Sequence, residues 1–153
     1  MKFAYIAPAL LGLPLAFAGD EPLTNTTLQA MIEGLGYTTK NIATDPAKSS
    51  LWEFTVKTTA FNVPMSAEIS PSGNYVWVTV NLGAQPKENA SLVGLLKANS
   101  SIQPSFFYFT TKTENLKLAH PIDNRNISPA ILKRVIDKVV KDVDSNASVW
   151  QAK

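Results

Sequence analysis

The sequence predicts an α+β fold, with an antiparallel sheet of about five strands that carries its helices on one face. Two observations lead to this class. Stretches in which apolar and polar residues alternate occur between residues 51 and 82 and again between residues 104 and 120. Stretches with helical spacing flank them, which gives the order α-β-β-β-α-β-β-α. Short turns join consecutive strands, and this favours antiparallel over parallel pairing.

The composition fits one globular domain and excludes several kinds of chemistry. The chain has 153 residues, of which 45% are hydrophobic and 17% charged, enough for a sizeable core. It has no cysteine and one histidine, so disulfides, thiolate metal sites and His-rich metal sites are excluded. A net charge of +2 lacks the clustered basicity of a nucleic-acid-binding protein. We therefore expect no metal, no cofactor and no nucleic-acid partner.

The first eighteen residues have the pattern of a secretory signal peptide. Lys2 supplies a positive start, and the following apolar run of 16 residues ends in small residues at Ala16 and Ala18. A membrane-spanning helix needs about 20 apolar residues, and Pro8 and Pro14 interrupt this shorter run. We predict a cleaved signal over residues 1–18, no permanent membrane span afterwards, and a single domain over residues 19–153. Small secreted eukaryotic domains are usually rich in disulfides, whereas this chain has no cysteine. We therefore expect an exported bacterial protein that is periplasmic or otherwise secreted.

The domain is expected to begin with a helix. Thr24 or Asn25 is suited to its N-cap, and Gly36 is suited to end it in a left-handed conformation. The apolar residues in between recur at helical spacing: Leu28, Met31, Ile32 and Leu35. Residues 38–50 are polar and are expected to form a loop.

Three alternating stretches then predict an antiparallel meander: SLWEFTVKTT, VPMSAEIS and YVWVTVNL. In the third stretch the aliphatic side chains share one face: Val76, Val78, Val80 and Leu82. Tyr75 and Trp77 therefore point to the opposite face.

A second helix over residues 88–99 and two more strands, SFFYFTT and LKLAH, are expected next. The helix has Leu92, Leu95 and Leu96 on one stripe. Ser128 and Pro129 are suited to open the last helix as N-cap and first helical residue. That helix has a broad apolar stripe from Ile131 to Val143, as expected for packing against a sheet, and its charged residues predict a solvated opposite face.

Over residues 23–150 this pattern resembles the YbjN and type III secretion chaperone (CesT-like) group. Four stretches carry the resemblance: LQAMIEGLGY, YVWVTVNLG, LVGLLKANSSIQPSFFYFTTKTENLKLAHPID and ISPAILKRVIDKVVKDVD. It implies a compact α+β domain that binds proteins without catalysis, often as a homodimer. In one respect the chain departs from the group, because secretion chaperones act in the cytosol whereas this sequence begins with an export signal.

Four aromatic residues are the candidates for partner binding: Tyr75, Trp77, Phe106 and Tyr108. Large aromatic side chains on an exposed sheet face are typical of binding hot spots. Either Phe107 and Phe109 face the core and leave Phe106 and Tyr108 outside, or the reverse holds. The helix over 88–99 or the loop over 38–50 could also cover this face. The hypothesis is that Tyr75 and Trp77 contribute to binding a partner or a second copy.

Two alternative functions use other parts of the chain. In the first, the sheet and the last helix enclose an apolar cavity, and the protein carries a small apolar ligand. In the second, His120 serves a hydrolase, with Asp123 and Ser128 as nearby members of a Ser-His-Asp set. Ser128 lacks the Gly-x-Ser-x-Gly context of a nucleophile elbow, so we expect no catalytic residue and place His120 at a surface strand end.

Overall fold

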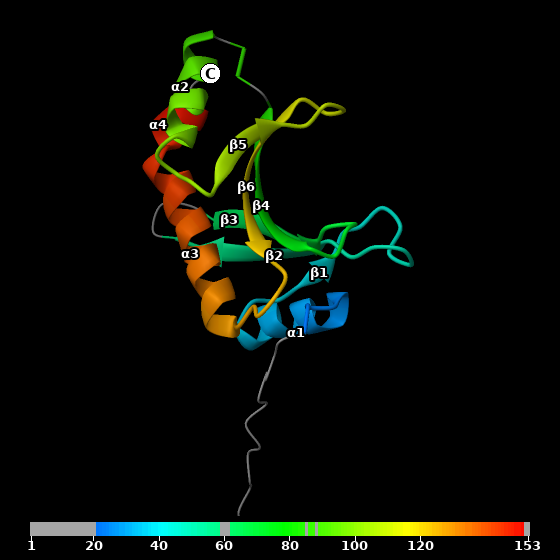
Figure 1. The fold of residues 1–153 in the computed structure, drawn as a ribbon. Coiled ribbons are helices and arrows are strands. Elements are labelled where there is room, and N and C mark those ends of the chain that lie inside the picture. Colours follow the sequence, from blue (N-terminus) through cyan, green and yellow to red (C-terminus); the bar gives the residue numbers. More distant parts are fainter. Residues whose placement is uncertain (1–20, 59–61, 85, 88, 152–153) are drawn as a thin grey trace, which may run out of the picture.

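The computed structural model describes residues 21–58, 62–84, 86–87 and 89–151 of the chain (Figure 1). The signal peptide predicted over residues 1–18 lies outside the described residues. Within the described part, no helix has the length and apolar character needed to cross a membrane.

The fold consists of a six-stranded sheet and helices packed against it. The helices are α1 (Asn25–Gly34), α2 (Asn89–Asn99), α3 (Pro129–Ser145) and the short α4 (Ala147–Trp150). The strands are β1 (Lys40–Asn41), β2 (Trp52–Lys57), β3 (Asn62–Ile69), β4 (Tyr75–Ala84), β5 (Phe106–Phe109) and β6 (Asn115–Asp123). All neighbouring strands are antiparallel, in the order β1-β2-β3-β4-β6-β5. The expected α+β class is confirmed.

The five strands expected from alternation all form, and β1 is an additional one. This strand lies in the segment that was expected to be a loop, and its two residues pair with Trp52 and Glu53. Asn41 also accepts backbone hydrogen bonds from Ala43 and Leu51 through its side chain. Two polar residues cannot show an alternation of apolar and polar side chains, so β1 could not be predicted from the sequence. The strand exists because these residues pair with β2.

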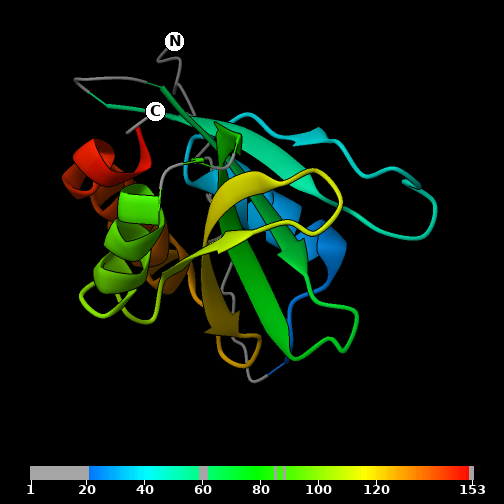
Figure 2. The same ribbon diagram turned by 90° about the horizontal axis from the view of Figure 1, so that it is seen from above.

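The helices share one side of the sheet and enclose the core there. In Figures 1 and 2, α2, α3 and α4 lie together on one side, and α1 closes the end of the sheet beneath β2 and β3. The core joins the inward side chains of five strands to α1, α2 and α3. It includes residues that are at most 1% exposed: Leu28, Ile32, Met65, Val78, Leu118, Leu132 and Ile136.

Both predicted signals at the ends of α1 are confirmed. The Thr24 side chain accepts from the Thr27 backbone N–H, and the Thr27 side chain accepts from the Thr24 N–H, so two free amide groups are satisfied. Gly36 follows the helix at a φ of 91°, a conformation that glycine adopts without steric strain.

The stripe predicted for α2 is only partly right. Leu95 is buried, but Leu96 is 71% exposed. Helix α2 packs beside the edge strand β5 and against α4. A smaller part of its surface is therefore buried than in a helix that lies across a whole sheet. The side chain of Asn99 connects the end of α2 to β5. It accepts a hydrogen bond from the Phe107 backbone N–H at 2.7 Å and donates one to the Phe107 carbonyl at 3.2 Å.

Helix α3 begins as expected. The Ser128 side chain accepts from the Ile131 backbone N–H at 3.2 Å, and Pro129 is the first helical residue. The expected solvated face holds for Lys133 and Asp137, which pair at 2.5 Å, but not for Asp142, which is only 8% exposed. Asp142 is instead buried and pairs with Lys138 at 2.6 Å.

Candidate protein-binding site

The face of the sheet that points away from α3 carries the candidate residues. In the strand register, Trp77 lies opposite Glu68 and Pro121, and Phe106 lies opposite Ala119. Because side chains alternate along a strand, these residues all project from the face opposite the core. No helix of the described part of the chain crosses this face (Figures 1 and 2). We call it the open face.

The four candidate aromatic residues form one continuous row on the open face. The ring centroids of Tyr75 and Trp77 are 6.3 Å apart, and those of Trp77 and Phe106 are 6.0 Å apart at an angle of 89°. Phe106 and Tyr108 follow at 5.8 Å. These separations are typical of favourable edge-to-face and tilted pairs. We call this group the aromatic row.

The structure decides between the two orientations left open for β5. Phe107 is 6% exposed and belongs to the core, and Phe109 packs against the core from its edge. Phe106 and Tyr108 are half-buried on the open face, and Tyr75 is 46% exposed. Helix α2 lies on the core side, and the segment over 38–50 joins the sheet through β1 at the edge opposite β5, so neither covers the aromatic row (Figure 1).

A hollow of about 340 Å³ lies within the open face. The small side chains of Thr79 and Ala119 form its floor, and the larger side chains around it rise as walls: Glu68, Trp77, Phe106 and Tyr108. The depth arises from this contrast in size, because small residues in two central strands lie between aromatic residues. We call it the aromatic hollow.

Tyr108 lines the aromatic hollow together with Thr79. Burial is the main cause that raises the pKa of its phenol, and the nearby negative charge of Glu68 raises it further. A hydrogen bond with the Thr79 side chain acts in the opposite direction. The phenol of Tyr108 therefore remains protonated at neutral pH and can donate a hydrogen bond inside the hollow.

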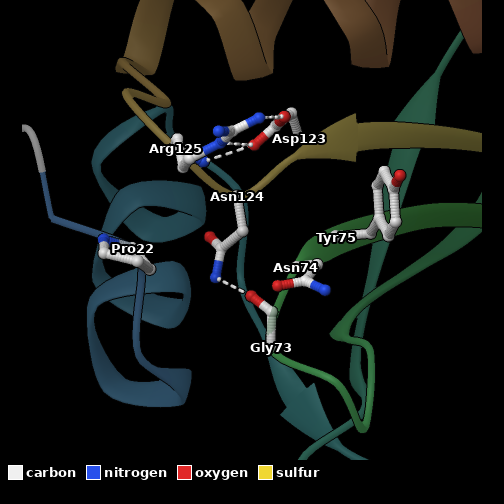
Figure 3. A pocket seen from close by; sticks show the side chains of 7 residues that line it. All are labelled: Pro22, Gly73, Asn74, Tyr75, Asp123, Asn124 and Arg125. Atoms are coloured by element: carbon white, nitrogen blue, oxygen red, sulfur yellow. Dashed lines mark hydrogen bonds and ion pairs between the residues drawn. The ribbon is translucent and has the colours of Figure 1, made fainter.

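A second hollow of about 350 Å³ adjoins Tyr75, where β4 begins and β6 ends (Figure 3). Figure 3 shows the Asn124 amide turned towards Gly73, with Tyr75 on the other side of the hollow. Asn124 is 2% exposed, and its side chain binds the Leu23 backbone N–H and both the Leu23 and Gly73 carbonyls. This hollow is organised around a structural clamp that ties the N-terminal segment to the β3–β4 turn.

Asp123 is occupied by Arg125 and does not approach His120. The guanidinium forms an ion pair with the carboxylate, and the Arg125 backbone N–H also donates to it at 3.1 Å. These hydrogen bonds lower the pKa of Asp123 to about 2. Ser128 caps α3, so neither residue joins a catalytic set with His120.

The expectation that His120 ends a strand at the surface is wrong. His120 is 6% exposed in the middle of β6, opposite Val78 on the core face. Its Nδ1 lies 2.9 Å from the hydroxyl of Ser105, which is 1% exposed. A substrate could not reach this pair, and we assign it a structural role.

Two residues of α3 adjoin this buried pair: Asp142, which is also buried, and Lys138, which is partly exposed. Lys138 Nζ donates to the carbonyl of Ile102 at 2.7 Å and to Asp142 Oδ2 at 2.6 Å, and lies 3.5 Å from Ser105 Oγ. Ser105, Lys138 and Asp142 were not identified from sequence. The spacing of Lys138 and Asp142 was visible there, but only the placement of α3 shows that they face inwards.

The buried group predicts a pH dependence of stability. Burial, and then the charge of Lys138, lower the pKa of His120 from 6.5, and Asp142 opposes them. The unfolded chain therefore binds a proton more readily than the folded chain. The contribution of neutral His120 to the free energy of unfolding should be greatest above about pH 6.5. It should decrease as the pH drops below that value, and stop decreasing below the pKa of His120 in the folded state.

Urea unfolding at about pH 7.5 and about pH 5 measures this effect. The variant His120→Asn keeps a hydrogen-bonding side chain but does not titrate, so it should lose less stability between these pH values than the unchanged protein. Equal losses in the two proteins would show that His120 is not responsible.

The space beneath α3 bears on the carrier alternative. Side chains of α3 that are at most 1% exposed fill the interface with the sheet: Leu132, Ile136, Val139 and Val143. A hollow of about 110 Å³ lies at one end, lined by Val143, Trp150 and residues of β3 and β4. Small-molecule sites usually measure about 300 to 1,000 Å³. The hollow next to α3 is smaller than this range, so it gives no support to a ligand cavity between the sheet and α3.

Two solved complexes contain chains with a similar structure. A chain of the HopA1–SchA chaperone–effector complex matches with a TM-score of 0.52 at 11% identity, over 83% of this chain and 92% of that one. A chain of the heterodimeric ExoU–SpcU complex from the type III secretion system of Pseudomonas aeruginosa matches with a TM-score of 0.55 at 14% identity. That match covers 80% of this chain and 96% of the other.

The chain shares its fold with the matched chains of these two complexes. The resemblance noted from the sequence is thereby confirmed at the level of the fold, and the likeness to YbjN stays a prediction. No protein-family model matches the sequence, and no curated protein matches it significantly. At such low identity the similarity establishes the fold alone.

Proposed function

We propose that the protein is an exported, non-catalytic, chaperone-like module that binds another protein through the open face. The observation that carries this proposal is the aromatic row, which lies on a sheet face that no helix of the described residues covers. Hot spots of protein interfaces are rich in tryptophan and tyrosine. The partner is a protein or a second copy of the chain.

The solved complexes support a protein partner in general terms. Both are complexes of two proteins, and one is described as a chaperone with its effector. The fold therefore serves protein binding in other chains. We propose export from the signal pattern of residues 1–18, and with it a binding partner in the periplasm or outside the cell.

The absence of catalysis is proposed from the state of the polar residues. The one histidine and its serine neighbour are buried beneath α3, and Asp123 and Ser128 are engaged elsewhere. A nucleophile and its base need access to a substrate. This arrangement gives structural roles to the residues that a hydrolase would have used.

Site-specific photo-crosslinking in the native host tests the proposal. A benzoylphenylalanine at position 75, in place of the exposed Tyr75, should form covalent adducts with a protein. The same group at position 141, in place of Lys141 on the exposed side of α3, should form none. Adducts at position 141 with none at position 75 would contradict a binding role for the open face.

A further inference from the structure

The aromatic hollow combines ring walls with one carboxylate. Trp77, Phe106 and Tyr108 border the hollow together with Glu68. Glu68 lies directly opposite Trp77 in the β3–β4 register, so both project from the open face. Ring faces carry negative electrostatic potential, and a nearby anion adds to it. The combination attracts a cation.

The carboxylate of Glu68 has no cation of its own within the described residues. It is exposed, and it takes part in none of the ion pairs found there. Lys48, which lines a neighbouring hollow with Glu68, pairs with Asp45 at 2.9 Å. Lys117 lies opposite Tyr108 in the register but does not line the aromatic hollow.

The carboxylate of Glu68 and the phenol of Tyr108 both border the aromatic hollow. The negative charge of Glu68 raises the pKa of the Tyr108 phenol. The hollow measures about 340 Å³, at the lower end of the range for small-molecule sites. A volume of this size has room for one long side chain.

We propose that the aromatic hollow binds an arginine side chain of the protein partner, stacked on Trp77 and paired with Glu68. The proposal rests on the protein-binding function proposed above and names the residue type that the site selects. Arginine is favoured over lysine because its planar guanidinium stacks on aromatic rings and presents paired N–H donors to a carboxylate. It is also less strongly hydrated, so it enters a half-buried hollow at lower cost.

The test uses Nα-acetyl-arginine amide as the probe, titrated into the nitrogen-15-labelled protein and followed by the indole N–H signal of Trp77. We expect a saturable shift of this signal. The indole of Trp52, which donates to the Asn25 carbonyl at 3.1 Å, should not respond and serves as an internal control. The citrulline analogue has the same shape without the charge and should bind far more weakly.

A matched pair of variants locates the effect. Glu68→Gln should weaken binding of the arginine probe by about fivefold or more at low salt. Glu53→Gln removes the same charge from the same face outside the hollow and should leave binding unchanged. Equal shifts with citrulline, no shift of the Trp77 signal, or equal effects of the two variants would overturn the arginine site.

The arginine titration and the crosslinking at position 75 test the two proposals separately. Adducts at position 75 without any response to arginine would keep the protein-binding function and remove the arginine site. A specific arginine response without adducts at position 75 would support the site and contradict the proposed function. Because the two readouts are independent, each proposal can fail alone.

Discussion

Replacing Trp77 by alanine should weaken binding of the protein partner by about 30-fold or more. Trp77 lies in the centre of the aromatic row, in ring contact with Tyr75 and Phe106, and borders the aromatic hollow. Its removal deletes the largest apolar surface of the row and leaves the neighbouring rings without their shared contact. Affinity can be measured by titration calorimetry with the partner captured at position 75.

The control for Trp77→Ala is Leu96→Ala on α2. Leu96 is 71% exposed and apolar, but it lies outside the open face. We expect it to leave the affinity within about twofold, because scattered surface apolar residues contribute little. Circular dichroism should show that both variants are folded. Loss of binding in Leu96→Ala with normal binding in Trp77→Ala would move the interface from the sheet to α2.

Replacing Asn124 by alanine should lower the free energy of unfolding by about 2 to 4 kcal/mol. The side chain is 2% exposed and forms hydrogen bonds with the Leu23 N–H at 3.0 Å, the Leu23 carbonyl at 3.2 Å and the Gly73 carbonyl at 2.9 Å. Alanine removes all three and leaves these backbone groups without that partner. Urea unfolding monitored by tryptophan fluorescence measures the loss.

The same change at Asn74 provides the matched control. Asn74 lines the same hollow, but its side chain is exposed. Its backbone carbonyl accepts from the Asn124 N–H at 2.8 Å, a bond that the substitution does not remove. Asn74→Ala should therefore change stability by no more than about 0.5 kcal/mol. Similar losses in both variants would show that the amide of Asn124 is not the clamp.

The aromatic row could be predicted from sequence because it follows from strand alternation. Once Val76 and Val78 are assigned to the core, Tyr75 and Trp77 must point the other way. For β5 the pattern alone left two orientations, since four aromatic residues in succession carry no polar marker. Pairing with β6 decides between them: Phe107 lies opposite the buried Leu118, and Phe106 lies opposite Ala119.

The aromatic hollow could not be predicted, because its parts come from four strands. Glu68, Thr79, Phe106 and Ala119 are brought together by the order β3-β4-β6-β5, in which β6 lies between β4 and β5. Local sequence patterns do not specify which strands are neighbours. The role of Asn124 could not be predicted for the same reason, because its partner Leu23 is 101 residues away in the sequence.

The sequence by itself determined the elements of this protein: five of its strands, the caps of α1 and α3, and the face on which each aromatic residue of β4 lies. These features depend on neighbours a few residues apart, where alternation and capping act directly. Only the tertiary structure decided how the elements meet. It buried His120 with Ser105 beneath Lys138, created β1, and set the aromatic rings around a carboxylate, because burial and pairing depend on contacts between distant segments.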